Sequence, residues 1–237
     1  QRKFQQPSSR HSVKRFSIFS LARNALTGHR NWEKMWRSPD PRREYDVVII
    51  GGGGHGLGAA YFLAKEHGIT NVAVLEKGWL GGGNTGRNTM TVRSNFLRED
   101  SVPFHEMSLD LYHQLSRDLN YNLMVSQRGM ITFIQSSAAN RVALQMANTM
   151  HIYGAEYRML TLDEVKQKIP IFDPSPDMRL PVRGGVYQPR ASMVRHDAVA
   201  WGFARAADAR GVDIIQNCEV TGIQQEGGAV PGAETNR

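Results

Sequence analysis

The chain has 237 residues, of which 41% are hydrophobic, and a formal net charge of +7. Its length allows one large domain or two small ones, and no apolar run approaches the ~18 residues that suggest a membrane span. The single cysteine, Cys218, excludes an internal disulfide and suits a reducing cytosol. We therefore expect a cytoplasmic protein with no membrane span.

The positive charge lies in a basic N-terminal arm, residues 1–44. This arm holds 11 Lys and Arg against 3 acids, whereas residues 45–237 hold 18 against 19. The charge is therefore no argument for nucleic-acid binding, and no nucleic-acid partner is expected. Three interpretations of the arm stay open: a segment that docks on a partner protein, which we favour, an organellar presequence, and a membrane-surface segment.

The folded part opens with a predicted strand, a glycine turn (residues 51–56) and a helix. Residues 47–50 are apolar and fit a strand buried on both faces. Gly51, Gly53 and Gly56 then match G-x-G-x-x-G. The first permits a tight turn, the second lets the backbone approach a pyrophosphate, and the third lets the helix lie against the strand. The helix N-terminus offers N–H groups to phosphates, so the turn predicts a dinucleotide site.

A second predicted strand, residues 71–75, ends at Glu76, 25 residues after Gly51. An acid at this place accepts hydrogen bonds from the ribose hydroxyls of a bound adenosine. The alternative is a structural turn followed by a surface glutamate, but the complete strand–helix–strand context favours the dinucleotide site.

The segment after Glu76, residues 78–89, favours FAD over a nicotinamide cofactor, and we call it the flavin loop. Residues 78–88 are too rich in glycine for a regular element, and 81–89 carry many hydrogen-bond donors. Such a loop can follow FAD beyond its pyrophosphate, whereas an NAD dehydrogenase usually continues into a crossover helix. A flexible polar surface loop is the alternative. The predicted FAD-binding residues are Gly51, Gly53, Gly54, His55, Gly56, Glu76, Lys77, Asn84, Thr85, Arg87, Asn88 and Thr89.

Further elements are predicted along the rest of the chain. They are, in order, helix 99–119, strand 129–134, helices 138–150 and 162–169, strand 185–187, helix 197–209, strand 212–215 and the start of a hairpin at 219–228. On the first helix, Met107, Leu111, Leu115 and Leu119 share one apolar face. The hairpin lies close to the last residue given, so we expect the working protein to be longer.

Four stretches of sequence carry a family resemblance. They are residues 17–43, the glycine turn with Leu57, the loop GGGNTGRNT at 81–89 with 92–95, and RHDAVAWGFARAAD at 195–208. Together they closely resemble the β subunits of heterotetrameric sarcosine oxidases, which belong to the D-amino-acid-oxidase-like flavoproteins. The resemblance covers most of residues 16–237. It implies an α/β fold, with the arm at 1–44, a Rossmann-like FAD-binding domain at 45–120 and 191–237, and part of an inserted α+β substrate domain at 121–190.

The resemblance implies oxidative demethylation of a secondary amino acid, with sarcosine as the favoured substrate. Hydride equivalents pass from the N-methyl carbon to noncovalent FAD, then to FMN and oxygen, which yields peroxide. The imine hydrolyses to glycine and formaldehyde, or its one-carbon unit passes to tetrahydrofolate on a partner subunit. The implied partners are the α, γ and δ subunits of a heterotetramer.

The resemblance also implies that FMN is joined covalently through its 8α carbon to His196. Asp197 is a plausible N-cap, so His196 is expected in a loop just before a helix. The positive end of the helix dipole disfavours the imidazolium and leaves a ring-nitrogen lone pair available. Without the family, His196 would be interpreted as an ordinary surface histidine.

Two further residues have candidate roles. Arg93 follows the flavin loop and is a candidate clamp for a substrate carboxylate, because guanidinium binds carboxylate in a bidentate fork. A surface or phosphate-facing Arg93 is the alternative. Val220 is expected to end the strand after the His196 helix and to touch the adenine of FAD through backbone atoms, or else to be a core residue.

Other features leave questions open. The histidines show no metal-ligand spacing, so no metal is expected. Met90–Thr91 stands where the family pattern has Thr followed by a β-branched aliphatic residue, which leaves the substrate preference open. Two rival functions remain: a single-flavin D-amino-acid or secondary-amine dehydrogenase of the same fold, and a noncatalytic FAD-binding remnant or fragment.

Overall fold

The computed structural model describes residues 17–30, 34–96 and 98–237, and the chain divides into two compact units, Gln1–Met35 and Trp36–Arg237. In the first unit, helix α1 (Ile18–Leu26) begins after Ser17, whose side chain accepts a hydrogen bond from the Ser20 N–H. The α1 side chains Phe19 and Leu26 are 83% and 89% exposed. Much of the predicted arm, residues 1–16 and 31–33, lies outside the described residues.

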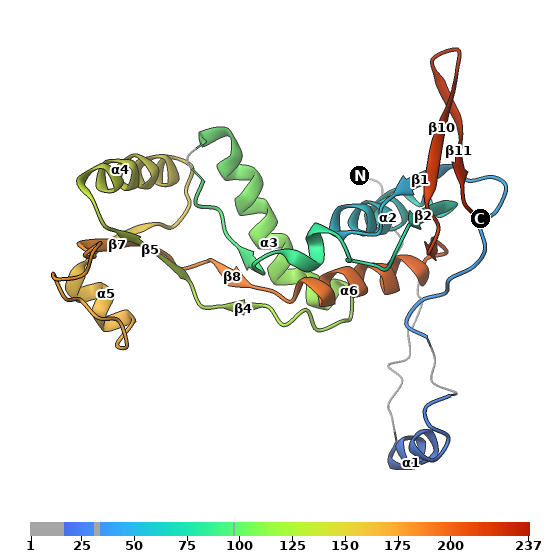
Figure 1. Cartoon of the computed structure of the whole chain (residues 1–237), viewed down its shortest axis with the longest axis horizontal. Coiled ribbons are helices and arrows are strands. Elements are labelled where there is room, and N and C mark those ends of the chain that lie inside the picture. Colours follow the sequence, from blue (N-terminus) through green and yellow to red (C-terminus); the bar gives the residue numbers. More distant parts are fainter. Residues whose placement is uncertain (1–16, 31–33, 97) are drawn as a thin grey trace, which may run out of the picture. The chain divides into compact units, whose positions relative to one another are not determined.

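The second unit contains a three-stranded parallel sheet in the order β1-β2-β9, of which Figure 1 labels β1 and β2. Its strands are β1 (Val47–Ile50), β2 (Val72–Glu76) and β9 (Asp213–Gln216), and helix α2 (Gly54–His67) connects the first two. Alternate residues of β2 point to opposite faces. Val72 and Val74 belong to the main core, whereas Ala73 and Leu75 pack with Cys218 on the other side. The predicted strand–turn–helix–strand is confirmed.

Helices α2 and α6 (His196–Asp208) share the main core with one face of this sheet. Small residues bring the two helices close together, since a Cβ added at Gly58 would lie 3.7 Å from the Phe203 ring. Ala200 and Ala204 of α6 are fully buried in the same core. The part of this sheet face formed by β2 and β9 is therefore closed to water, whereas Val47 and Ile49 of β1 are only partly buried.

Strand β1 departs from its prediction. The sequence predicts burial on both faces, but Val48 and Ile50 are 42% and 55% exposed. Val47 and Ile49 pack on the main core, so the alternating Val48 and Ile50 point to the opposite face. In the described sheet β1 also has a neighbouring strand on one side only.

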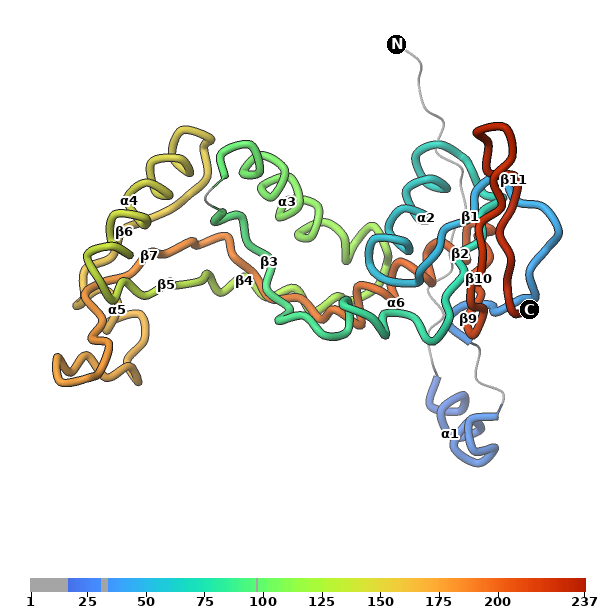
Figure 2. Tube along the Cα trace, turned by 45° about the horizontal axis from the view of Figure 1, so that its top comes forward, coloured from blue at the N-terminus to red at the C-terminus, as the bar shows by residue number. Residues whose placement is uncertain are grey.

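The second unit also contains two three-stranded antiparallel sheets. One contains β3 (Thr91–Val92), β8 (Ser192–Met193) and β4 (Ser126–Gln127), and the other contains β5 (Met130–Ile134), β7 (Gly184–Gln188) and β6 (Arg158–Thr161). The chain runs from β4 into β5 and from β7 into β8, so two segments link the sheets (Figure 2). Helices α4 (Ser137–Ile152) and α5 (Leu162–Lys168) contact the second sheet. The sequence predicts β5, β7 and both helices but misses the two-residue strands and β6.

Helix α3 (Val102–Asp118), with the 3₁₀ helix η2 (Glu99–Ser101) before it, confirms the helix predicted over 99–119. Its predicted apolar face is only half right. Leu115 and Leu119 are buried, but Met107 and Leu111 are 53% and 44% exposed. The helix turns Glu106 inward instead, because this carboxylate bonds to side chains from two other segments.

The predicted hairpin is confirmed as β10 (Val220–Glu226) and β11 (Ala229–Thr235). Gly227 and Gly228 have φ of +55° and +83° and form the two-residue turn that such positive angles favour. Val220 opens β10, so the prediction that it ends the strand after α6 is wrong. That strand is β9, which ends at Gln216.

Candidate functional site

The glycine turn has the close backbone contacts that its motif predicts. Gly51 has φ +108° and donates its N–H to the Leu75 carbonyl at 2.8 Å, which joins the turn to β2. A Cβ added at Gly56 would lie 2.1 Å from the Gly51 carbonyl oxygen. The first turn of α2 therefore lies directly against the end of β1, and only glycine fits at position 56.

Glu76 lies at the same sheet edge and binds the turn directly. Its two carboxylate oxygens accept the N–H groups of Gly52 and Gly78, both at 2.8 Å. A carboxylate oxygen has more than one lone pair, so each oxygen can also accept a ribose hydroxyl. The side chain thereby ties the glycine turn to the start of the flavin loop.

The flavin loop packs on the glycine turn and contains a short regular element. Gly81 N–H donates to the Gly52 carbonyl at 2.9 Å, and Thr85 Oγ1 accepts the Gly54 N–H at 2.9 Å. Residues Asn84–Arg87 form the 3₁₀ helix η1, so the prediction that no regular element occurs here is wrong. Tight i→i+3 turns tolerate glycine, which the sequence pattern alone does not indicate.

Asn88 closes this loop. Its side-chain amide donates to the Thr85 carbonyl at 2.6 Å and accepts the Met90 N–H at 2.7 Å. Met90 has φ +61°, a conformation that few non-glycine residues adopt. The Asn88 side chain thus supports a strained backbone directly before β3.

Other predicted cofactor residues have side chains that face solvent. His55 is the second residue of α2, so its backbone N–H belongs to the first helical turn, whose donors lack intrahelical acceptors. The exposed predicted residues are His55, Lys77, Asn84, Arg87, Asn88 and Thr89.

His196 is the first residue of α6, and Arg195 rather than Asp197 is its N-cap. The prediction of an Asp197 cap is wrong, because this carboxylate forms an ion pair with Arg195 and accepts the Ala198 N–H at 2.8 Å. The Arg195 hydrogen bond lowers the pKa of Asp197. Among the described residues, the buried Nδ1 of His196 has no hydrogen-bond partner. An unpaired buried ring nitrogen is costly, and it needs an explanation.

The flavin loop approaches α6 one helical turn beyond this histidine. A Cβ added at Gly81 would lie 3.4 Å from the Ala200 Cβ. The segment that leads to Val220 contacts the end of β2, because the Cys218 N–H donates to the Glu76 carbonyl at 2.9 Å. The parallel sheet thus gathers the glycine turn, Glu76 and the Val220 segment at the carboxyl ends of its strands, where this class of fold binds nucleotides.

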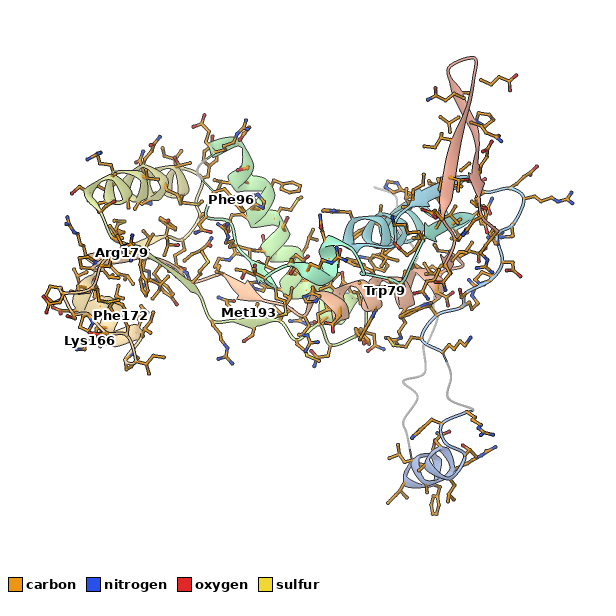
Figure 3. All side chains as sticks on the ribbon, viewed as in Figure 1. Trp79, Phe96, Lys166, Phe172, Arg179 and Met193 are labelled. Carbon is orange, nitrogen blue, oxygen red and sulfur yellow. The ribbon has the colours of Figure 1, made fainter. Side chains whose placement is uncertain are left out.

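Arg93 follows β3 and has an aromatic platform. Its guanidinium lies 4.5 Å from the centre of the Phe96 ring, and its Nη1 donates to the Asn95 side-chain oxygen at 2.7 Å. Phe96, labelled in Figure 3, stacks in turn on His105 of α3, with the ring centroids 3.9 Å apart. Burial of the His105 ring, together with the nearby charge of Arg93, lowers the pKa of His105. Burial raises the pKa of Tyr157 to about 12. The arginine has five N–H donors, so donors remain for a ligand.

A polar cluster behind Arg93 is missed by the sequence predictions. We call it the Glu106 network, and its members are Ser94, Glu106, Asp110, Gln188 and Arg190. Glu106 accepts hydrogen bonds from Ser94 and Arg190, Gln188 donates to the Ser94 hydroxyl, and Arg190 pairs with Asp110. The helical spacing of Glu106 and Asp110 was the available signal, but Arg190, which pairs with both, lies 84 and 80 residues away in sequence.

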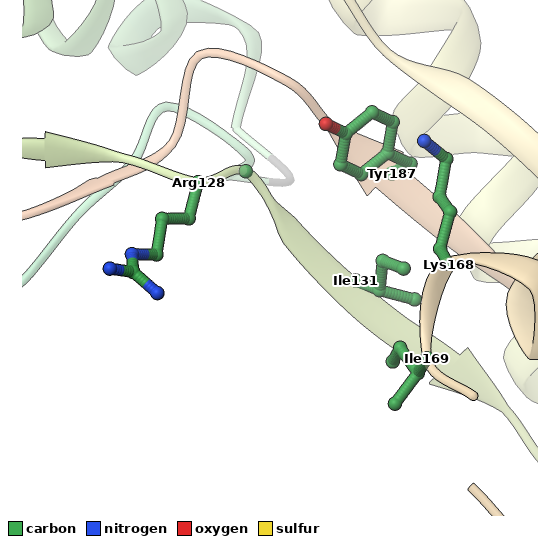
Figure 4. A pocket seen from close by; sticks show the side chains of 6 residues that line it. Arg128, Ile131, Lys168, Ile169 and Tyr187 are labelled. Carbon is green, nitrogen blue, oxygen red and sulfur yellow. The ribbon is translucent and has the colours of Figure 1, made fainter. Parts of the chain in front are cut away.

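A separate pocket of about 300 Å³ lies beside the second antiparallel sheet (Figure 4). Its lining includes Arg128, Lys168 and Tyr187, and the Lys168 ammonium lies 4.2 Å from the centre of the Tyr187 ring. No predicted site residue lines this pocket. Across the described ranges, no cluster of three or more His, Cys, Asp or Glu residues is arranged to hold a metal ion. Within the same part of the chain, no helix has the length and apolar character to cross a membrane.

Comparisons with known proteins agree with this geometry. The chain is 52% identical over 223 residues to sarcosine oxidase subunit beta of Rhizobium meliloti (strain 1021), covering 94% of this chain and 53% of that protein. It is 50% identical over 205 residues to the subunit of the same name from Arthrobacter sp, covering 86% and 51%. The chain therefore spans about half the length of the curated relatives it matches.

Solved structures support the fold. L-proline dehydrogenase from P. horikoshii aligns with a TM-score of 0.76 at 24% identity, covering 83% of this chain and 50% of that chain. Glycine oxidase from Bacillus cereus ATCC 14579 aligns with a TM-score of 0.70 at 26% identity, covering 81% and 52%. The predicted α/β FAD-binding fold is confirmed. Residues 46–237 match the family model described as FAD dependent oxidoreductase (DAO), and the chain belongs to this family.

Proposed function

We propose that this chain is the flavin-carrying part of an enzyme that oxidatively demethylates sarcosine, as a β-type subunit of a heterotetramer. The observation that carries the proposal is the set of contacts that joins the glycine turn, Glu76 and the flavin loop at residues 51–89. These contacts occur in a chain that is about half identical to two sarcosine oxidase β subunits. The products would be peroxide and either glycine with formaldehyde or a one-carbon unit transferred to tetrahydrofolate on a partner.

The residues at the sheet edge suit noncovalent FAD. The contact at Gly56 leaves bare backbone at this place. The Gly54 N–H donates to Thr85, and the other N–H donors of the first α2 turn favour an anionic pyrophosphate. Glu76 would bind the ribose hydroxyls, and the flavin loop with Thr85 and Asn88 would follow the rest of the cofactor. Lys77, Asn84, Arg87, Thr89 and the backbone near Val220 are proposed as further contacts.

His196 suits a covalent FMN. Its Nδ1 is buried without a partner among the described residues, and His196 is the first residue of α6. A neutral imidazole with an unused lone pair is the form that can attach to an electrophilic carbon. When bound, the flavins supply the two-electron chemistry and the transfer to oxygen.

Arg93 would bind the substrate carboxylate. Phe96 and Asn95 orient its guanidinium, and a bidentate arginine holds a carboxylate in one plane. We propose that the amine binds as its free base. This leaves orientation and exclusion of water as the main tasks of the protein.

The proposed partners, location and domain division rest on the similarity to the sarcosine oxidase β subunits. The partners would be α, γ and δ subunits, and the location would be the cytoplasm, in keeping with a single, buried Cys218. The arm at 1–44 would dock on a partner. Residues 45–120 and 191–237 would form the FAD-binding domain, and 121–190 would belong to a substrate domain.

Anaerobic titration of purified holoprotein with sarcosine tests the activity. Loss of the oxidised flavin absorbance near 450 nm, in roughly stoichiometric proportion, supports it. Reduction only by D-amino acids or other secondary amines would favour a single-flavin dehydrogenase, and bound FAD that no amine reduces would favour a noncatalytic protein.

Peptide mapping of the same holoprotein tests the covalent flavin. The His196 peptide is expected to carry the mass of FMN, and acid-precipitated protein is expected to remain yellow. An unmodified His196 peptide from fully loaded, active protein would contradict this part of the proposal.

Glu76→Gln tests the FAD site. The amide has one oxygen for the N–H groups of Gly52 and Gly78, and its own NH₂ then faces one of these donors. FAD affinity is therefore expected to fall about tenfold. Fluorescence titration of apoprotein with FAD measures the change. Glu66→Gln on α2, whose side chain is 53% exposed, is the matched control.

A further inference from the structure

The Glu106 network joins three segments that are distant in sequence. Ser94 lies in the loop after β3, Glu106 and Asp110 lie on α3, and Gln188 and Arg190 lie at the end of β7 and before β8. Ser94 and Gln188 are 0% and 1% exposed, and the Glu106 side chain is 15% exposed. The centre of the network is therefore removed from water, whereas the Asp110 side chain at its margin is 61% exposed.

Within this network, Ser94 is held from two sides. Its hydroxyl donates to Glu106 and accepts from the Gln188 amide, and its backbone N–H donates to Gln188 Oε1 at 3.4 Å. Glu106 uses its second oxygen for Arg190. Both the side chain and the backbone of residue 94 are thus fixed, directly beside Arg93.

The same network reaches the segment that leads to His196. Ser192 pairs with Val92 in the β3–β8 ladder, and its hydroxyl contacts His113 Nε2 of α3 at 3.2 Å. The Val194 N–H donates to the Met90 carbonyl at 2.9 Å. Helix α3 therefore fixes two adjacent segments, one ending at Arg93 and the other at His196.

Stability alone is a weak reason for such a cluster. A largely buried ion pair contributes little net stability compared with well-packed apolar side chains, because removing the charges from water costs about as much as their attraction returns. A network with fixed hydrogen-bond directions instead defines one orientation of the groups attached to it.

We propose that Glu106, Ser94 and Gln188 are positioning residues that fix the Arg93 guanidinium for a substrate carboxylate. The inference rests on the proposed function, because it takes Arg93 as the carboxylate clamp. These residues act through the backbone at position 94, and Arg93 then lies over Phe96. Loosening the network lets Arg93 leave this orientation without removing a flavin contact.

Two variants of the holoprotein test the inference. Glu106→Gln keeps the size of the side chain but turns an NH₂ toward Ser94 or Arg190, and Ser94→Ala removes the central hydroxyl with almost no change in volume. In each, the sarcosine KM and the dissociation constant of acetate, measured by perturbation of the flavin absorbance, are expected to rise about tenfold, with kcat within about threefold. Melting temperature and flavin content report folding separately.

The controls separate a positioning role from a structural one. Glu99→Gln is the same substitution at an exposed position just before α3 and is expected to leave KM and acetate binding unchanged. In an Arg93→Lys background, Glu106→Gln is expected to add no further loss, because both changes act on the same contact. If the Glu106→Gln protein does not bind flavin, the Ser94→Ala protein alone is used for the test.

The outcomes are distinguishable. Wild-type KM and acetate affinity in folded, flavin-loaded Ser94→Ala or Glu106→Gln, or losses that add to those of Arg93→Lys, would overturn the positioning role. Wild-type holoprotein that neither binds acetate nor is reduced by sarcosine would instead overturn the proposed function.

Discussion

Gly56 is the residue at which one added methyl group does the most damage. Its Cβ would lie 2.1 Å from a backbone oxygen, and backbone at both ends of the contact cannot move aside as a flexible side chain can. We expect Gly56→Ala to destabilise the protein by about 3 kcal/mol and to reduce bound FAD, measured by denaturant unfolding and by the flavin-to-protein ratio.

Gly83→Ala is the matched control for this prediction. Gly83 lies in the flavin loop with φ −82°, and an added Cβ would meet no atom within 4 Å. Normal FAD content in Gly56→Ala, or an equal loss in Gly83→Ala, would show that close approach of α2 to β1 is not what the site requires.

His105 gives the protein a pH-dependent stability. Burial lowers its pKa below the ordinary 6.5, with Arg93 adding to the effect, so the folded state binds the proton less well than the unfolded state. Its contribution to stability is therefore fully present above about pH 6.5 and declines as the pH falls through the folded pKa. The melting temperature of His105→Gln should accordingly change less between pH 7.5 and 5.5 than that of the wild type. His67→Gln, at the exposed end of α2, should follow the wild type.

At the scale of elements, Asp213 anchors the segment before β1 to the start of β9. Its buried carboxylate lies 2.8 Å from Arg42 Nη2 and 3.5 Å from Arg37 Nη2, and accepts the Tyr45 hydroxyl at 3.1 Å. Both arginines are about half exposed, so Asp213→Asn is expected to cost about 2 kcal/mol rather than the full penalty of a buried pair. Chemical unfolding of Asp213→Asn against the exposed control Asp46→Asn measures this, and equal stabilities would contradict it.

Local signals explain which elements the sequence predicts. The glycine turn, α2, β2 and the β10–β11 hairpin each depend on residues close in the chain, and all are confirmed. Strand β3 could not be predicted, because its only two pairs join Thr91 to Met193 and Val92 to Ser192. The Glu106 network could not be predicted for the same reason, because Gln188 and Arg190 lie 80 to 94 residues in sequence from the network residues that they contact.

The N-cap of α6 shows a second limit. A capping aspartate is a good local signal, yet Asp197 lies inside the helix because Arg195 takes its carboxylate. The identity of His196 as a candidate flavin residue comes from a family resemblance, and its buried, unpaired Nδ1 emerges only from the packing.

For the whole molecule, the strand order of the parallel sheet predicts the side on which a longer protein would add a strand. The order β9-β2-β1 corresponds to strands 3-2-1 of a doubly wound sheet, in which a fourth strand lies on the free side of strand 1 and the ligand binds at that reversal point. Val48 and Ile50 are exposed on β1, and the matched relatives are about twice as long as this chain. We predict that in a protein of the relatives' full length a further segment covers these two side chains.

Ile50→Ser distinguishes a covered edge from a free one. In the 237-residue chain it is expected to cost less than about 1 kcal/mol, because the side chain is already 55% exposed. In a protein of the relatives' full length that contains these residues, the cost should rise to about 3 kcal/mol, as for other buried aliphatic side chains. Ile49→Ser is the control, since Ile49 packs on the main core and should be costly in both proteins. Equal, small effects of Ile50→Ser in the two proteins would mean that β1 remains an edge, and the cofactor crevice would then have to form without a neighbouring strand.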